Sequence, residues 1–393
     1  MPVNYQQALQ QIREMGKQLP QQVQRQRQLH MLAEDVFHLI AYELDTLDQL
    51  VEVAAAGNPK LRCARPFREA LDWHVQAPPL EEAYALLAAD GSQINPDRHG
   101  MVEFGAINVG VIQIRPGQGQ SLTEQVRSRL MFQEDLYTAS GSPLTDDLVA
   151  LMRDLAERQE LVSLARSEPG PVITLTDGPL ELFRDAKGSR EFETEFEKYQ
   201  GVLEDLAAMD VATAGYVDRP RSDLVIRLLE LVILKRSGKF DQAGIDRPLL
   251  HIRDEFLFHD LLKPGDRSAV FAIHAGAGRG FSGRLALHFF YLNVGRENHP
   301  YIARVEIPLW VAENERLLNL LHGCLVAQSH HLGARPYPYV LHRAHEIAVI
   351  SFDERDQLET MIAAELRKQG VFVDDRSNKQ LAKDSSSNHT RSR

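Results

Sequence analysis

The sequence predicts an α/β protein with a mixed central sheet flanked by helices, preceded by a helical N-terminal arm. Short runs of β-branched and apolar residues alternate along the chain with segments whose apolar residues recur every three or four positions. The chain has 393 residues, of which 44% are hydrophobic and 25% charged, so it can bury a large core. The same composition excludes a fibrous or disordered main body.

The net charge and the cysteine content restrict the kind of protein and the kind of site that the chain can form. Acidic residues outnumber basic ones by 55 to 44, and the resulting charge of −11 argues against a generally basic nucleic-acid-binding surface, although a local basic groove remains compatible with it. Cys63 and Cys324 are too few for a disulfide framework or a cysteine-rich zinc site. The N-terminus lacks the apolar segment of a signal peptide, and no apolar run approaches the roughly 18 residues of a membrane span. We therefore expect a cytoplasmic protein without a membrane partner.

Residues 4–56 form a segment rich in glutamine and charge, with apolar residues such as Leu32, Val36 and Leu47 at helical spacing. Pro20 is expected to interrupt this helix, and Gly57-Asn58-Pro59 to end it. We predict that residues 1–60 are a helical arm that packs either on the body of the protein or on a second subunit. Coiled-coil pairing is a further possibility, but the apolar repeat is short.

Strands and helices alternate in the rest of the chain. Strands are expected at residues 84–89, 102–114, 172–176, 211–217, 269–274, 285–294 and 302–309. Helices are expected at residues 144–165, 191–209, 222–235 and 315–331, with a last helix from the capping box of Ser351 and Glu354 to about Gln369. This pattern favours one large α/β domain with an insertion or subdomain at about 235–285. Residues 374–393 have almost no apolar side chains and are predicted to be a disordered tail.

Two of the expected apolar strands are followed directly by the dipeptide Asp-Gly, at Asp90 and at Asp177. Glycine lets the backbone turn sharply, which would leave each aspartate at the tip of its strand, and neighbouring strands release their loops into one crevice. Two carboxylates about 5 Å apart at an effective dielectric of about 20 repel by roughly 3 kcal/mol. Mg²⁺ or Mn²⁺ would remove this repulsion. A single Asp-Gly is more often an ordinary turn, so the prediction depends on the pair.

A third carboxylate would strengthen the prediction of a metal site. The helix expected at 144–165 carries Glu157 and Glu160 near the edge of its apolar stripe. Most helix glutamates are solvated, and spacing alone does not choose between these two.

Histidines near the C-terminus are the other candidates for chemistry. His342 and His345 are three residues apart and can share a helix face, and His330 and His331 lie close in sequence. Neither a cysteine pair nor an HExxH motif accompanies them, which weakens a zinc interpretation. A histidine beside an acidic metal cluster would more plausibly orient or protonate phosphate oxygens.

Five segments in order, DGS, LMRDLAERQ, TDGPL, ARVEIP and PYPYVLHRAH, make the chain resemble the NurA nuclease family over roughly residues 80–352. The resemblance implies a ribonuclease-H-like core in a nuclease domain at 80–370, and a homodimer. It also implies DNA cleavage with Mn²⁺ or Mg²⁺, two ions being expected, by a single-strand endonuclease and 5′–3′ exonuclease. The implied partner is a HerA-type hexameric ATPase that acts in DNA end processing and repair.

The resemblance also assigns residues. Asp90, Glu157 and Asp177 correspond to the family's metal ligands and His345 to its C-terminal histidine, so these four are the predicted catalytic residues. Glu157 is preferred because it follows Arg153 by four residues, as in the family pattern. Glu160 stays the alternative if the helix register differs.

The sequence does not decide which tyrosine belongs to the site or which arginines contact phosphate. A tyrosine that the family uses in its site matches either Tyr291 or Tyr301. Arg98, Arg219 and Arg221 follow expected strands and are candidates for sequence-independent phosphate contacts, although each alone is more often a plain surface arginine.

Two alternatives to a nuclease, an ATPase and a structural adaptor, have less support in the sequence. The chain contains no GxxxxGK[ST] motif, so any ATP-driven translocation must come from a partner, and the glycine-rich residues 276–283 are expected to be a loop. ATPases of the sugar-kinase or actin type would need a further glycine and a threonine after Asp90, where this chain has SQINPDR. The non-enzymatic alternative is a structural adaptor of the ATPase. All three carboxylates are present, which argues against it.

Overall fold

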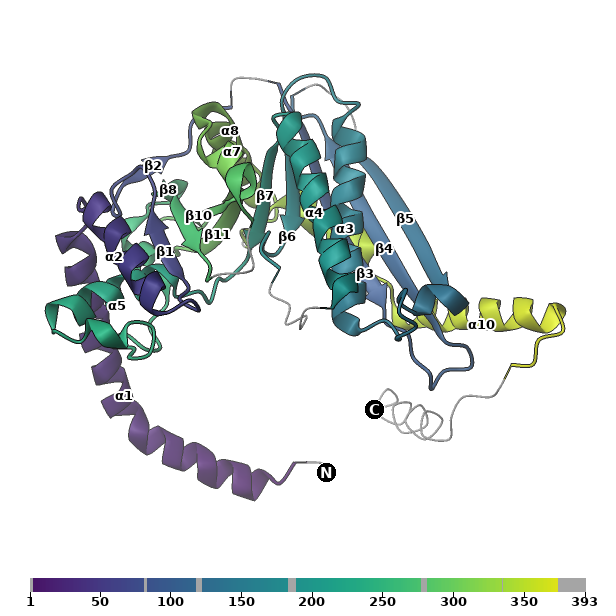
Figure 1. Cartoon of the computed structure of the whole chain (residues 1–393), viewed down its shortest axis with the longest axis horizontal. Helices are drawn as coiled ribbons and strands as arrows, with labels where there is room; N and C mark the ends of the chain where they lie inside the picture. The colour runs from purple at the N-terminus through teal and green to yellow at the C-terminus, as the bar shows by residue number, and fades with distance from the viewer. Residues whose placement is uncertain are drawn as a thin grey trace. The chain divides into compact units, whose positions relative to one another are not determined.

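The computed structural model describes residues 3–80, 83–117, 122–182, 189–276, 281–333 and 335–373 (Figure 1). The chain forms two compact units, which we describe one at a time. Unit 1 comprises Met1–Pro78 and Val217–Ala312, and unit 2 comprises Pro79–Tyr216 and Glu313–Arg393. The proposed division into arm, nuclease domain and insertion stays a prediction, and the predicted tail at 374–393 lies outside the described residues. Among the described helices, none has the length and apolar character needed to span a membrane.

Unit 2 is built on a mixed sheet whose strand order is β5-β4-β3-β6-β7. Strands β3 to β5 form an antiparallel meander, whereas β6 runs parallel to β3 and β7 parallel to β6. The bounds are β3 (Ala85–Ile94), β4 (Phe104–Ile114), β5 (Thr123–Phe132), β6 (Val172–Asp177) and β7 (Ala212–Val217). This order and these directions are those of a ribonuclease-H-like core, so the predicted fold class is confirmed.

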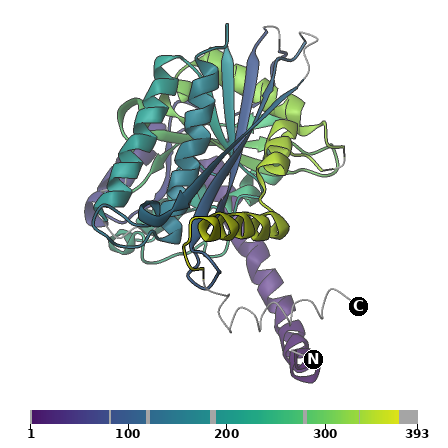
Figure 2. The same cartoon turned by 90° about the vertical axis from the view of Figure 1, so that its right-hand side faces the viewer.

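Helices cover the sheet of unit 2, and the views in Figures 1 and 2 show α3 and α4 together on one side of the strands. Helix α9 packs on the other side of β3 and β4. Successive residues of a strand point to opposite faces of the sheet, and along β3 Gly91 contacts α3 whereas Ser92 contacts α9. The helices are η1 (Gln133–Leu136), α3 (Asp146–Ala165), α4 (Arg190–Ala208), α8 (Glu315–Ser329), α9 (Tyr339–Ala348) and α10 (Phe352–Lys368). The predicted capping box at the start of α10 is present.

Unit 1 has an antiparallel sheet in the order β1-β9-β10-β11, with β8 on β10 and β2 on β8. Its strands are β1 (Cys63–Pro66), β2 (His74–Gln76), β8 (Asp266–Ser268), β9 (Phe271–His274), β10 (Leu287–Asn293) and β11 (Ile302–Pro308). Its helices are α1 (Tyr5–Leu39), α2 (Leu44–Gly57), α5 (Leu224–Arg236), η2 (Phe240–Gln242), α6 (Asp254–Leu261), η3 (Gly283–Leu285) and α7 (Leu309–Ala312).

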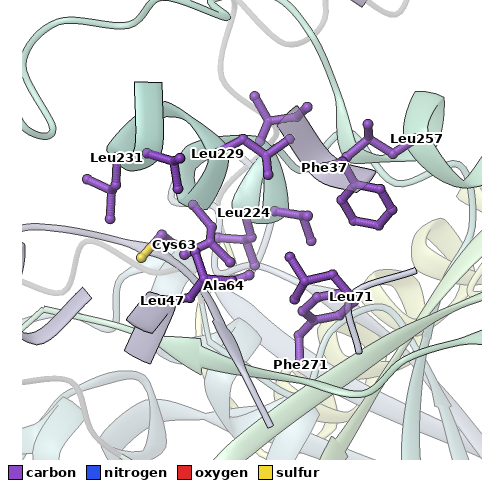
Figure 3. Close-up of a cluster of buried hydrophobic side chains, with 14 of the residues drawn as sticks. Phe37, Leu47, Cys63, Ala64, Leu71, Leu224, Leu229, Leu231, Leu257 and Phe271 are labelled. Atoms are coloured by element: carbon purple, nitrogen blue, oxygen red, sulfur yellow. The ribbon is translucent and has the colours of Figure 1, made fainter. Parts of the chain in front are cut away.

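The core of unit 1 joins segments that are far apart in sequence. Phe37 and Leu47 of the N-terminal helices lie in the same buried cluster as Leu224 and Phe271 (Figure 3). Phe271 belongs to the 235–285 segment. This segment therefore shares its core with the N-terminal helices.

Three local expectations were wrong. Pro20 lies inside α1, which continues to Leu39 and bends along its length in Figure 1. Proline removes one helical hydrogen bond and kinks a helix, and the turns on both sides can persist. The helical segment instead breaks after Leu39, and α2 begins at Leu44. Strand β5 was not expected, and β3 continues four residues beyond Asp90.

Candidate active site

Asp90 lies in the middle of β3, at the point beyond which β3 is paired on one side only. Strand β6 pairs with β3 only up to Ala89, opposite Thr176, whereas β4 stays paired with β3 as far as Ile94. The expectation that Asp90 sits at a strand tip was therefore wrong, because antiparallel pairing with β4 keeps β3 extended. Asp90 is nevertheless at an edge, since its neighbour β6 ends beside it.

Asp177 is the last residue of β6 and so lies at this same edge of the sheet. Gly178 follows with φ of +84°, a conformation that glycine adopts at low cost, as predicted for the Asp-Gly turn. Gly215 on β7 makes room for this turn, because a Cβ there would lie 2.6 Å from the carbonyl oxygen of Gly178. The two aspartates of the sequence pattern thus come from neighbouring parallel strands, which is the condition on which the predicted pair of facing carboxylates depends.

Glu157 reaches the site from α3 and is only 6% exposed. The carboxylate lies over Gly91, where a Cβ would come within 2.7 Å of Glu157 Oε1. The glycine after Asp90 therefore has a role that the sequence did not reveal. It leaves space for a helix carboxylate to approach the β3 backbone.

Glu160, the alternative helix glutamate, lies one turn further along α3. Its Oε2 is 3.8 Å from Arg127 Nε of β5, and its side chain is 28% exposed. Of the two glutamates, Glu157 is thus the one buried against Gly91.

Arg153 and Asp154, which lie on the same helix, are two further charged groups beside Glu157. Arg153 Nε is 3.4 Å from Glu157 Oε1, and Arg153 Nη2 is 2.8 Å from Asp154 Oδ1. A pocket of about 300 Å³ is lined by Arg153, Asp154, Glu157 and Arg158 of α3 and by Asp177 and the residues after it. Carboxylates from the helix and from β6 therefore face one cavity.

His345 of α9 contacts Asp90 directly. Its Nδ1 lies 2.7 Å from Asp90 Oδ2, while the imidazole is 60% exposed. A hydrogen bond from Nδ1–H to Asp90 would leave the other ring nitrogen as the acceptor. His342, on the same helix, is 3.5 Å from Glu346 instead.

Tyr337 was not expected from the sequence. The hydroxyl of Tyr337 donates a hydrogen bond to Asp177, and its ring packs edge-on against Tyr216 at 5.5 Å. The signal that points to it is its place in PYPYVLHRAH, eight residues before His345. The tyrosines proposed instead lie in unit 1, where Tyr291 is fully buried and bonded to Asp254, and Tyr301 donates to Asp218.

The pKa values of two carboxyl groups in the site are raised, so ionising both of them is unfavourable. Burial raises the pKa of Glu157 to about 8, with a further contribution from Asp154 and a smaller one from Asp90. Burial also raises the pKa of Asp177, and nearby Asp90 adds to this effect, whereas the hydrogen bond from Tyr337 opposes it. Additional positive charge would therefore be favourable here.

The donor chemistry of the site suits a hard divalent cation, because Asp90, Asp177 and Glu157 offer carboxylate oxygens and Asp90 repels each of the other two. The side chains do not form a complete coordination shell for a metal ion in this structure. Within the described ranges, no three His, Cys, Asp or Glu side chains are grouped closely enough to hold a metal ion. Arg153 is instead the cation beside Glu157 and Asp154.

The three arginines considered as phosphate contacts are all exposed. Arg98 lies in the loop after β3 of unit 2, while Arg219 and Arg221 lie after β7 in unit 1. Arg219 Nε donates to the hydroxyl of Tyr301 at 3.1 Å. Their role stays a prediction.

Fold and site together define an α/β protein of the ribonuclease-H-like class with carboxylates gathered at one sheet edge. The family model described as the NurA domain matches residues 84–350, about two thirds of the chain. The chain therefore belongs to the NurA nuclease family.

Solved structures with a similar fold have low sequence identity. The chain is similar to the NurA nuclease from Sulfolobus solfataricus at 14% identity and a TM-score of 0.48, covering 84% of this chain and 96% of that one. It is also similar to the catalytic domain of human Endonuclease V at 15% identity and a TM-score of 0.36, covering 81% and 98% of the two chains. A search of curated proteins found no significant match.

Proposed function

We propose that this protein is a metal-dependent nuclease that hydrolyses phosphodiester bonds in DNA. The observation that carries the proposal is that Asp177 ends β6 beside Asp90 of β3 and lines one pocket with Glu157. Three carboxylates, two of which are repelled by Asp90 as the third, and one histidine are a suitable set for phosphoryl chemistry. Membership of the NurA family supports the same conclusion.

Asp90, Asp177 and Glu157 would hold the metal, one or two ions of Mn²⁺ or Mg²⁺. Bound there, the metal would supply Lewis-acid chemistry that stabilises negative charge on the phosphoryl and leaving oxygens. The protein's own contribution is to keep the carboxylates in place. Tyr337 holds Asp177 through its hydroxyl, Gly91 leaves room for Glu157, and Arg153 neutralises part of their charge.

His345 is the candidate for proton handling. Because Nδ1 is engaged by Asp90, the ring orientation is fixed and Nε2 is left to exchange a proton with a phosphate oxygen or a water molecule. Its exposure gives it access to a substrate. Arg98, Arg219 and Arg221 are proposed to contact the DNA backbone without reading its sequence.

The family suggests a wider setting, which we include in the proposal. The protein would act as a homodimer in the cytoplasm, cut single-stranded DNA internally and degrade strands in the 5′–3′ direction, and work with a HerA-type hexameric ATPase in end processing and repair. The sequence has no P-loop of its own, which is consistent with a separate motor.

The decisive experiment measures cleavage of end-labelled single- and double-stranded DNA with Mn²⁺, with Mg²⁺ and with EDTA. Wild type is compared with Asp90→Asn and with Asp97→Asn, a matched change in the loop after β3 at a residue that pairs with Arg355. We expect metal-dependent cleavage that falls by about 10²–10³-fold in Asp90→Asn and is retained in Asp97→Asn.

The alternative function is a non-catalytic adaptor of the ATPase, and the same assay can establish it. Wild-type protein that fails to cut with either metal, and also fails in the presence of the ATPase and ATP, would contradict the nuclease. A complex with the ATPase that forms normally under those conditions would then favour the adaptor.

A further inference from the structure

The guanidinium of Arg153 lies among the carboxylates of the candidate active site. Its Nη2 donates to Asp154 Oδ1 at 2.8 Å, and its Nε lies 3.4 Å from Glu157 Oε1. Burial lowers the pKa of Arg153, but the negative charges of Asp154, Glu157 and Asp90 raise it by more. One arginine therefore interacts electrostatically with two of the three proposed metal ligands, Glu157 and Asp90.

The contact between Arg153 and Glu157 is poorly formed compared with another arginine–carboxylate pair of unit 2. Arg115 donates to Glu168 Oε2 from Nε at 2.7 Å and to Glu168 Oε1 from Nη2 at 2.6 Å. This arrangement with two parallel hydrogen bonds is the strong form of such a pair. Nε of Arg153, in contrast, is buried and has no hydrogen-bond partner among the residues that the structure describes. A buried donor without a partner costs free energy, so Glu157 holds the guanidinium only weakly.

Arg153 and Glu157 share the space above Gly91 of β3. A Cβ added at Gly91 would lie 2.7 Å from Cγ of Arg153 and 2.7 Å from Oε1 of Glu157. Both side chains also line the pocket of about 300 Å³ that Asp177 borders. A cation held by Glu157 and Asp177 would therefore be a neighbour of the guanidinium. Two positive groups that share one partly buried pocket repel each other.

We propose that Arg153 is a counter-cation built into the active site, and that its guanidinium leaves Glu157 when a divalent metal ion binds. In the metal-free protein, Arg153 offsets part of the repulsion between the carboxylates. In the metal-bound protein, Glu157 is released from Arg153 to serve as a ligand, and the hydrogen bond to Asp154 keeps the guanidinium attached to α3. Arg153 is thus a positioning residue that sets the affinity for the metal. The inference rests on the proposed function, because it requires Asp90, Glu157 and Asp177 to be metal ligands.

Arg158 lines the same pocket but is bound in a different way. Its Nε donates to the hydroxyl of Tyr199 at 2.6 Å, and its Nη1 donates to Thr176 Oγ1 at 3.0 Å. Arg158 is only 3% exposed, whereas 29% of the Arg153 side chain is exposed. Neutral groups of the core therefore fix Arg158, while Arg153 has both a weak contact to leave and solvent to move toward.

Metal binding to the full-length protein, in the absence of DNA, tests the effect on affinity. Isothermal titration calorimetry gives the Kd for Mn²⁺ at pH 8.5, above the pKa of about 8 of Glu157. Arg153→Met keeps an aliphatic chain over Gly91 without the charge, and we expect it to bind Mn²⁺ at least about tenfold more tightly than wild type. Arg153→Lys keeps the charge and should have an affinity closer to that of wild type. Arg166→Met, at a surface residue that pairs with Asp205 at 2.8 Å, is the matched control and should bind like wild type.

Chemical modification of the wild-type protein tests the displacement directly and needs no variant. Phenylglyoxal reacts with accessible arginines, and mass spectrometry of the peptides gives the rate at each one. Saturation with Mn²⁺ should raise the rate at Arg153 by at least about threefold, because the guanidinium then spends more time away from Glu157. Arg166, whose side chain is already 61% exposed, should react at the same rate with and without the metal and is the internal reference.

The outcomes separate this inference from the proposed nuclease. Mn²⁺ binding by Arg153→Met that is equal to or weaker than that of wild type would overturn the inference and leave a metal-dependent nuclease in place. A modification rate at Arg153 that Mn²⁺ lowers or leaves unchanged would do the same. If neither wild type nor Arg153→Met bound Mn²⁺, the metal site itself would be absent, and the inference and the proposed function would both fail. Tighter binding by Arg153→Met would support the inference even if the wild-type protein did not cleave DNA.

Discussion

Glu157 and Glu230 are both buried glutamates on helices, one in each unit, and their surroundings differ in kind. Glu230 of α5 accepts a hydrogen bond from the Leu249 backbone N–H at 3.0 Å and forms an ion pair with Arg247. Glu157 of α3 has Arg153 at 3.4 Å and two other carboxylates as its electrostatic neighbours. Glu230 belongs to a closed network, whereas Glu157 borders a pocket.

A structural carboxylate and a functional one can be distinguished by the groups that surround them. Burial raises the pKa of both glutamates, so a raised pKa alone does not identify a site. What marks Glu157 is that a like charge, Asp154, is the largest influence on its pKa after burial, that Asp90 adds to it, and that Asp177 shares its cavity. At Glu230, the cation Arg247 and the backbone donor of Leu249 outweigh the one like charge, Asp223.

The largest expected effect comes from Glu157→Gln, which should separate function from stability. Cleavage should fall by about 10²–10³-fold, because a proposed metal ligand is lost. In EDTA the same variant should be more stable than wild type at pH 8.5, by about 1–3 kcal/mol, and equally stable near pH 5. Urea unfolding at the two pH values measures the difference.

The sign follows from the pKa of Glu157. In the folded protein it is about 8, against 4.5 for the ordinary group, so between these values the folded state keeps a proton that the unfolded state releases. The stability of wild type therefore falls as pH rises through this range, and glutamine removes the effect. A variant that is less stable than wild type at pH 8.5 would contradict this account.

Glu230→Gln should have the opposite effect on stability. The change leaves Arg247 with Asp223, at 2.7 Å, but removes its second carboxylate, so the free energy of unfolding should fall by about 1–3 kcal/mol. The specific cleavage rate of the folded protein should stay within about twofold of wild type, because Glu230 belongs to a structural network. Unfolding and cleavage are measured on the same preparation, and a loss of cleavage with unchanged stability would assign Glu230 to the site.

Tyr337→Phe tests the support of the second aspartate. Loss of the hydroxyl removes the hydrogen bond to Asp177 while the ring keeps its packing against Tyr216. Removal of a group that orients a ligand typically costs about 10–100-fold in activity or metal affinity, and we expect a loss in this range. Tyr339→Phe, two residues along the chain, is the matched control. Titration of cleavage against Mn²⁺ distinguishes weaker metal binding from slower chemistry.

Much of the fold follows from local sequence signals, and the exceptions have physical causes. The buried strands β3, β4 and β6 are apolar runs, so periodicity finds them. Strand β5 is an exposed edge strand with Arg127 and Arg129, and its conformation depends on pairing with β4. A sequence pattern contains no signal for such a strand.

The site was only partly predictable for a similar reason. Asp90 and Asp177 are recognisable because Asp-Gly follows an apolar run. Their meeting depends on the parallel pairing of β3 with β6, which is a property of the sheet. The hydroxyl of Tyr337 acts on Asp177 across more than 150 residues of sequence, so no local pattern links the two.

Glu160→Gln should produce the smallest change and decides the register of α3. The side chain of Glu160 pairs with Arg127 at 3.8 Å on the surface, where an ion pair contributes at most about 1 kcal/mol, so stability should change by less than that. Cleavage should stay within about twofold of wild type. Because Glu157 and Glu160 are three residues apart on one helix, the same assay compares them directly. If Glu160→Gln abolishes cleavage while Glu157→Gln retains it, the glutamate of the active site is Glu160, and α3 must shift its register relative to β3 when substrate and metal bind.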